Sequence, residues 1–116
     1  MIPNVFAILS PAVSSIAEDR IFRTEAPQGA AQPFIVWTLI SGSPENLLNG
    51  PPEIDEARIQ FDAYALDQAT ARQLSQAAQL AVEAVGYVVM GPLESFESDT
   101  RLYRFTFDAT FWTSRA

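Results

Sequence analysis

An alternating segment in the middle of the chain reads Ala57-Arg58-Ile59-Gln60-Phe61-Asp62-Ala63-Tyr64-Ala65-Leu66. Its small and apolar side chains, at every second position, are Ile59, Phe61, Ala63 and Ala65. The side chains between them are Arg58, Gln60, Asp62 and Tyr64. Because successive residues of a strand point to opposite faces, this pattern predicts a strand with one buried face and one outward face.

The segment that follows has the periodicity of a helix. Asp67 suits the N-cap position, and Gly86 suits the position just past the last helical turn. The predicted buried face recurs every three or four residues and consists of Ala71, Leu74, Ala78, Ala81 and Val85. Since most of these side chains are Ala, we expect the helix to lie close to a sheet.

The remaining elements are shorter or less regular. We expect a short helix over 3–10, with Pro11 ending it or starting a second short turn, and a short strand from Ile21 that ends at the turn around Gly29. Further strands are predicted over 34–41, 87–91 and 103–111, the first covered on both faces and the second broken by Gly91-Pro92. The predicted fold is α+β: one domain over 1–116, with a mainly antiparallel sheet of about four to five strands, two helices on one face, and a long loop at about 42–56.

The composition excludes most enzymatic chemistry. The chain has 14 acidic and seven basic residues, a net charge of −7, and no His, Cys or Lys. It therefore lacks the residues of a Ser-His-Asp relay, a thiolate nucleophile, a Cys/His zinc site, a Schiff base and a phosphate-binding loop of the GxxxxGK type. We expect no enzyme activity, cofactor or metal.

An acidic surface without Lys also argues against binding to nucleic acid or anionic membranes. Trp37, Trp112 and the Phe residues near Trp112 could form a stacking platform for single-stranded nucleic acid, but core packing is the favoured interpretation because such platforms come with basic grooves. The N-terminal segment lacks the basic region of a secretory signal and a span long enough for a membrane. We expect the protein to be cytoplasmic where it is made.

Carboxylate chemistry is the one catalytic possibility left by this composition. Asp62 and Asp108 are predicted on the outward faces of two strands, where a pair of acids could cleave glycosides or hold a divalent ion. The favoured interpretation is structural, because Arg58 and Arg104 are predicted on the same faces and can pair with these acids.

Several short segments together resemble the small tail-completion or tail terminator proteins of tailed phages, of the siphophage type found at the head–tail junction. They are Arg20-Ile21-Phe22, Ala26-Pro27-Gln28-Gly29, Pro33-Phe34-Ile35-Val36, the strand Arg58 to Ala65, the helix segment Ala71-Arg72-Gln73-Leu74, Tyr103-Arg104 and Phe111-Trp112. Their order and spacing over residues 1–113 carry the resemblance.

The resemblance implies a structural α+β subunit of the virion that assembles into a hexameric ring capping the tail tube. Such a minor tail protein ends tube growth and presents a head–tail joining surface to the connector, while DNA passes through the lumen without specific binding. The implied partners are further copies of the chain, the tail tube protein and the connector. The implied location is the tail or neck of the virion, after assembly in the host cytoplasm.

Two groups of residues are candidates for contacts with other subunits. Outward charges on the strands, Arg58, Asp62, Arg104 and Asp108, can form geometrically specific guanidinium–carboxylate pairs. Leu47 and Leu48, in the predicted loop, suit docking onto a partner ring; the alternative is that both fold back onto the domain.

Two other functions fit the same composition. One is another neck component, a head-closure or connector subunit. The other, from a different class, is an acidic inhibitor or immunity-type module that mimics DNA or covers a basic site.

Overall fold

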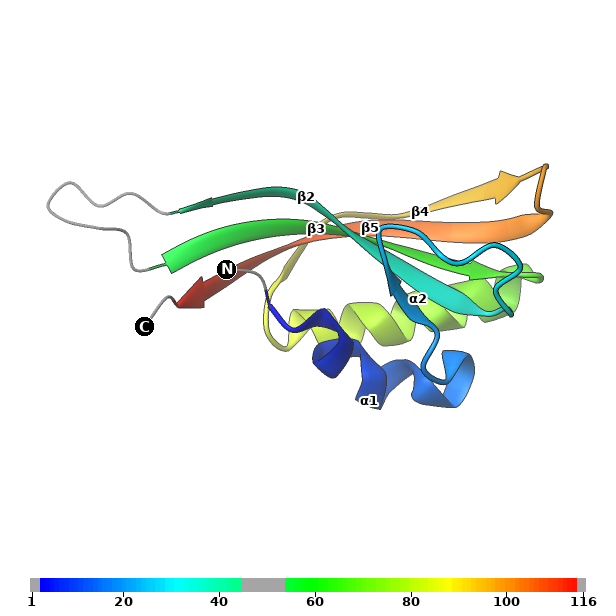
Figure 1. Cartoon of the computed structure of the whole chain (residues 1–116), viewed down its shortest axis with the longest axis horizontal. Coiled ribbons are helices and arrows are strands. Elements are labelled where there is room, and N and C mark those ends of the chain that lie inside the picture. The colour runs from blue at the N-terminus through cyan, green and yellow to red at the C-terminus, as the bar shows by residue number, and fades with distance from the viewer. Residues whose placement is uncertain (1–2, 45–53, 115–116) are drawn as a thin grey trace, which may run out of the picture.

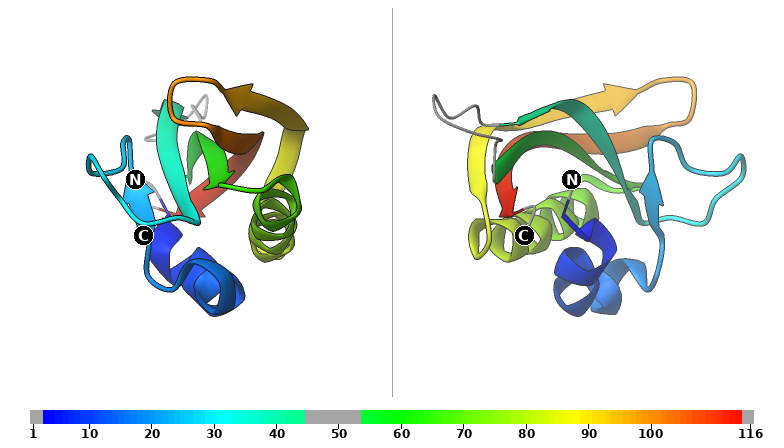
Figure 2. Two further views of the ribbon diagram at one scale, coloured as in Figure 1. Left: turned by 90° about the vertical axis from the view of Figure 1, so that its right-hand side faces the viewer. Right: turned by 60° about the vertical axis from the view of Figure 1, so that its left-hand side comes forward.

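The fold consists of two helices packed on one face of a five-stranded sheet (Figures 1 and 2). A computed structural model describes residues 3–44 and 54–114. The elements, in chain order, are α1 Val5–Ala17, β1 Ile21–Arg23, β2 Phe34–Pro44, β3 Ile54–Ala65, α2 Gln68–Glu83, β4 Tyr87–Glu97 and β5 Leu102–Ser114. This arrangement confirms the predicted α+β class. Neither helix in the described part of the chain is long and apolar enough to cross a membrane.

The strands follow the order β1-β2-β3-β5-β4 across the sheet. The short β1 pairs with β2 in parallel, and every other pair is antiparallel. The alternating segment of the sequence is β3, the central strand. Its inward residue Phe61 lies opposite Phe107 of β5, and their rings stack at a centroid distance of 4.9 Å. The two-residue period is therefore confirmed on both strands.

The main core lies between the sheet and the helices. Val5, Leu9, Val13 and Ala17 of α1 meet Leu74, Ala78 and Val82 of α2 and the inward residues of β2, β3 and β5. The predicted N-cap is confirmed, since the Asp67 carboxylate accepts hydrogen bonds from the backbone N–H and the hydroxyl of Thr70.

The C-terminal end of α2 differs from the prediction. The helix ends at Glu83, Val82 takes the buried position, and Val85 is exposed. Gly86 lies beyond the end without the positive φ expected of a helix-ending glycine. Its small size has another cause: a Cβ there would lie 2.8 Å from the carbonyl oxygen of Thr110 and 2.9 Å from Cδ1 of Phe111.

Two prolines that were predicted to interrupt elements do not. Pro11 lies inside α1, where it removes one backbone hydrogen bond. Both Pro11 and Ala7, the residue one turn earlier, are exposed, so water can reach the carbonyl group left without a partner. The helix continues to Ala17 because burial of its apolar face against the sheet outweighs this loss.

The second proline, Pro92, lies inside β4, which continues to Glu97 instead of breaking at Gly91-Pro92. A proline is tolerated there because β4 is an edge strand, whose outer N–H groups have no partner strand. The pairing with β5 shifts register on both sides of Met90, and Gly91 takes a φ of +93° in this irregular stretch.

The predicted loop at 42–56 is strand at both ends, since β2 runs to Pro44 and β3 begins at Ile54. The N-terminal part of β2 is covered on both faces, as predicted. On the outer face, away from the helices, Phe34, Val36 and Leu102 form a second cluster with Ala26 and Ala30 of the segment between β1 and β2. Further along the strand Ile40 is exposed, so the cover does not extend over all of β2.

Candidate subunit interface on the outer face of the sheet

The outward side chains of β3 and β5 meet on the face opposite the helices. The antiparallel register sets Asp62 opposite Thr106 and Tyr64 opposite Arg104. Gln60 likewise lies opposite Asp108, so the two aspartates are diagonal neighbours on adjacent strands. The structure therefore brings together the four charged residues that the sequence singled out, Arg58, Asp62, Arg104 and Asp108.

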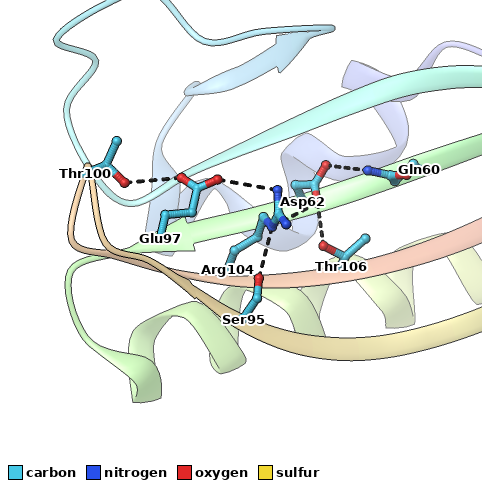
Figure 3. A network of polar contacts seen from close by, with 7 residues as sticks. All are labelled: Gln60, Asp62, Ser95, Glu97, Thr100, Arg104 and Thr106. Carbon is cyan, nitrogen blue, oxygen red and sulfur yellow. Dashed lines mark hydrogen bonds and ion pairs between the residues drawn. The ribbon is translucent and has the colours of Figure 1, made fainter.

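Asp62 is the most fully bonded member of this group (Figure 3). Although no helix covers it, it is only 5% exposed. One carboxylate oxygen accepts a hydrogen bond from the Thr106 hydroxyl, and the other accepts one from the Gln60 amide at 3.0 Å. A buried carboxylate without partners is costly. These bonds compensate for the burial and fix the orientation of Asp62.

Arg104 links three strands. Its Nε donates to the Ser95 hydroxyl of β4 at 3.2 Å and lies 3.9 Å from the Asp62 carboxylate of β3. Its Nη1 donates to Glu97 at 3.4 Å, and Glu97 in turn accepts from the Thr100 hydroxyl (Figure 3). Contact with the Tyr64 hydroxyl is the main cause that raises the pKa of Arg104 above its ordinary value. The guanidinium is thus held as a fixed cation that ties β4 to the centre of the sheet.

Tyr64 forms the boundary between this polar network and the outer apolar cluster. Its ring stacks on Phe34 at a centroid distance of 5.0 Å. Burial raises the pKa of Tyr64, the hydrogen bond with Arg104 opposes that shift, and the Asp62 carboxylate adds to it. The phenol therefore remains protonated at neutral pH and can act as a hydrogen-bond donor.

The second ion pair is less complete. Arg58 Nη2 donates to Asp108 Oδ2 at 3.1 Å, and Asp108 is 5% exposed. Among the described residues, neither the other oxygen of Asp108 nor Nε of Arg58 has a hydrogen-bond partner. Both atoms are buried, so this ion pair leaves one donor and one acceptor unsatisfied inside the subunit.

Each aspartate is thus paired with an arginine of the same subunit, as the structural interpretation of these carboxylates expected. In the described ranges, 3–44 and 54–114, no three acidic side chains gather as a metal ion would require. Arg58, Asp62, Arg104 and Asp108 remain predicted interface residues, and their charges are already used within the subunit. Leu47 and Leu48 lie outside the described residues.

A second surface feature was missed by the sequence reasoning. Glu83, Tyr87 and Trp112 line a recess of about 320 Å³ at the C-terminal end of α2. The prediction that Trp112 packs in the core is wrong, since it is 47% exposed, whereas Trp37 is buried. The strand pattern contained the signal: Phe111 faces inward, so the next residue must face outward.

Comparisons with known proteins agree with this architecture. A sequence model of the family "Tail completion protein gp17" matches residues 4–114. Among solved structures, the chain is similar to one described as "Virion of native gene transfer agent (GTA) particle". The TM-score is 0.69 at 11% identity, covering 95% of this chain and 91% of that one, which is a likeness of fold. No curated protein matches.

The family match spans nearly all of the described residues, including both helices and all five strands. It also confirms the resemblance read from the sequence and the virion location that follows from it. The chain therefore belongs to the tail completion protein gp17 family and is a structural subunit of the phage tail and neck.

Proposed function

We propose that this protein is a tail terminator: copies of the chain form a ring that caps the tail tube, ends its elongation and provides the surface onto which the head is joined. The observation that carries the proposal is the family match over residues 4–114. We further propose a hexamer, with the tail tube protein on one side of the ring and the connector on the other.

The electrostatics of the subunit support this role. A ring through which DNA slides should not grip phosphates, and Arg58 and Arg104 are both engaged by carboxylates of their own chain. Six copies, each with a net charge of −7, would carry roughly −42. This field is screened over about 8 Å at physiological salt, so subunit contacts depend on short-range pairs.

The interface proposal has two parts. On the outer face, the Arg58 side chain is 42% exposed, so its accessible part can contact a polar group of a neighbouring subunit. In the segment between β2 and β3, Leu47 and Leu48 would dock onto a partner ring. Replacing both leucines with Ser should then lower the yield of joined particles, and unchanged assembly would remove this segment from the interface.

Deletion of the gene from its parent phage tests the function as a whole. Lysates imaged by negative-stain electron microscopy should contain overlong, headless tails of variable length, and a plasmid copy of the gene should restore normal virions. Tails of normal length beside unjoined or leaking heads would instead assign the protein to head closure. Intact virions would contradict both roles.

A further inference from the structure

The recess at the end of α2 has the chemistry of a site for a cation. The rings of Tyr87 and Trp112 meet edge to face at a centroid distance of 5.4 Å and are 65% and 47% exposed. Exposed aromatic faces attract guanidinium groups, and Tyr, Trp and Arg are the side chains that most often dominate protein interfaces. Val85, also in the lining, is exposed as well.

Glu83 adds a negative charge to this recess. Within the described part of the chain, no hydrogen bond or ion pair engages its carboxylate. Glu83 is also the last residue of α2, where the helix dipole disfavours an acidic side chain. A guanidinium in the recess would supply the missing opposite charge. The recess, at about 320 Å³, lies at the small end of the range for ligand sites and suits a single side chain.

The chain itself contains candidate guanidinium groups. Among the described arginines, three are paired with acids, namely Arg20, Arg58 and Arg104. Arg23 lies over the ring of Trp37 at 4.9 Å. The two that remain without a side-chain partner among the described residues are Arg72 and Arg101, and both are exposed.

Geometry distinguishes these two arginines. Arg72 lies on α2 itself, 11 residues before Glu83, which places both side chains on one stripe of the helix about 16 Å apart. A contact between Arg72 and the Glu83 of another copy would join the same helix stripe of both copies, and when the contact is reciprocal it closes a two-fold dimer.

Arg101 lies in the turn between β4 and β5, separated from the recess by the length of β4, about 30 Å (Figure 1). Its backbone is fixed by a hydrogen bond from its N–H to the Glu97 carbonyl oxygen at 2.7 Å. A contact between Arg101 and the recess of another copy joins two different surfaces. Contacts of this head-to-tail kind generate rings when the rotation between copies closes, as the proposed ring requires.

We propose that the recess lined by Glu83, Tyr87 and Trp112 receives the Arg101 side chain of a neighbouring copy of this chain. The proposal rests on the ring of the proposed function and assigns one of its repeated contacts. It adds a charge pair and an aromatic contact to each subunit boundary.

Chemical cross-linking in virions tests the contact directly, because the chain contains no native Cys. A phage carrying Glu83→Cys and Arg101→Cys in the same chain is treated with a bis-maleimide linker about as long as an Arg side chain. The two positions are too far apart to be linked within one chain, so a ladder of oligomers up to a closed ring is expected. The matched control, Glu83→Cys with Arg72→Cys, should remain monomeric.

Charge reversal provides a second measurement that does not depend on the linker. Glu83→Arg and Arg101→Glu should each lower the phage titre about tenfold or more, the effect of losing a dominant interface residue, and the double variant should restore it. Arg72→Glu should leave the titre unchanged.

Three results would overturn the proposal: a ladder from the Arg72 pair instead, no ladder in virions with tails of normal length, or single reversals that have no effect or are not rescued by the double variant. In each case the deletion phenotype still tests tail termination separately. If deletion leaves intact virions, the terminator function fails, and the ring contact fails with it.

Discussion

Replacing Arg58 with Met should destabilise the fold by leaving a buried charge without its partner. Asp108 is 5% exposed, and Arg58 supplies its one side-chain hydrogen bond among the described residues. Breaking a fully buried ion pair costs about 3–5 kcal/mol. The Arg58 side chain is 42% exposed, so water can approach the remaining carboxylate. We therefore expect a smaller loss of about 2 kcal/mol in the free energy of unfolding.

Urea denaturation followed by tryptophan fluorescence measures this loss as a lower midpoint at unchanged slope. In a domain of this size the melting temperature should fall by roughly 8 °C. Adding Asp108→Asn should recover more than half of the loss, because the amide has nearly the same shape and no charge. The control Arg72→Met, at an exposed position, should change stability by less than about 0.5 kcal/mol.

A loss at Arg58→Met no larger than that of the control would refute the reasoning, since Asp108 would then not depend on its arginine. A double variant as unstable as Arg58→Met alone would also contradict it. The lost stability would then arise from packing of the Arg58 side chain and not from the unpaired charge.

Three further predictions concern local features. Gly86→Ala should lower the free energy of unfolding by about 1–3 kcal/mol, because the added Cβ would clash with Thr110 and Phe111 of β5. Gly29→Ala has open space around it and only an unfavourable φ of +78°, so it should cost about 1 kcal/mol. Equal urea midpoints for the two variants would contradict this. Asp67→Ala should lower stability at neutral pH, because it removes the helix cap. The capping hydrogen bonds with Thr70 lower the pKa of Asp67, so the difference in stability from the wild type should shrink as pH falls below about 3.8. Asp67→Ser should keep the cap without that pH dependence. Burial raises the pKa of Tyr64 above its ordinary value of 10.0, so stability should fall as pH rises through that value, and Tyr64→Phe should reduce the fall; an unchanged fall would contradict this.

The sequence predicted those features that depend on local periodicity. The alternation around Phe61 identified a strand with one buried face, and the three- and four-residue spacing around Leu74 identified the longer helix and its buried face up to Ala78. The outward acids and arginines were placed together because the same alternation governs both β3 and β5. These patterns reflect burial on one face, which a sequence records directly.

Features that depend on tertiary packing were not predicted. Pro11 is tolerated inside α1 because Leu9 and Val13 are buried on the other side of the helix, and Pro92 because β4 is an edge strand. The recess beside Trp112 is formed by the end of α2 and the start of β4 meeting β5, segments that no short-range pattern connects. These features depend on which elements pack together in the folded chain, and short-range sequence patterns do not record that.

The strand order has a consequence for biosynthesis. β5, the last of the described strands, lies between β3 and β4 near the middle of the sheet. While the ribosome is still translating residues before Leu102, β4 has no neighbouring strand and β3 has only β2. The nascent subunit therefore cannot close its core before β5 is made, and its apolar strands are exposed to chaperones and to other chains in that interval. Completion of the sheet, and with it the competence to join a tail, is delayed until β5 has been synthesised.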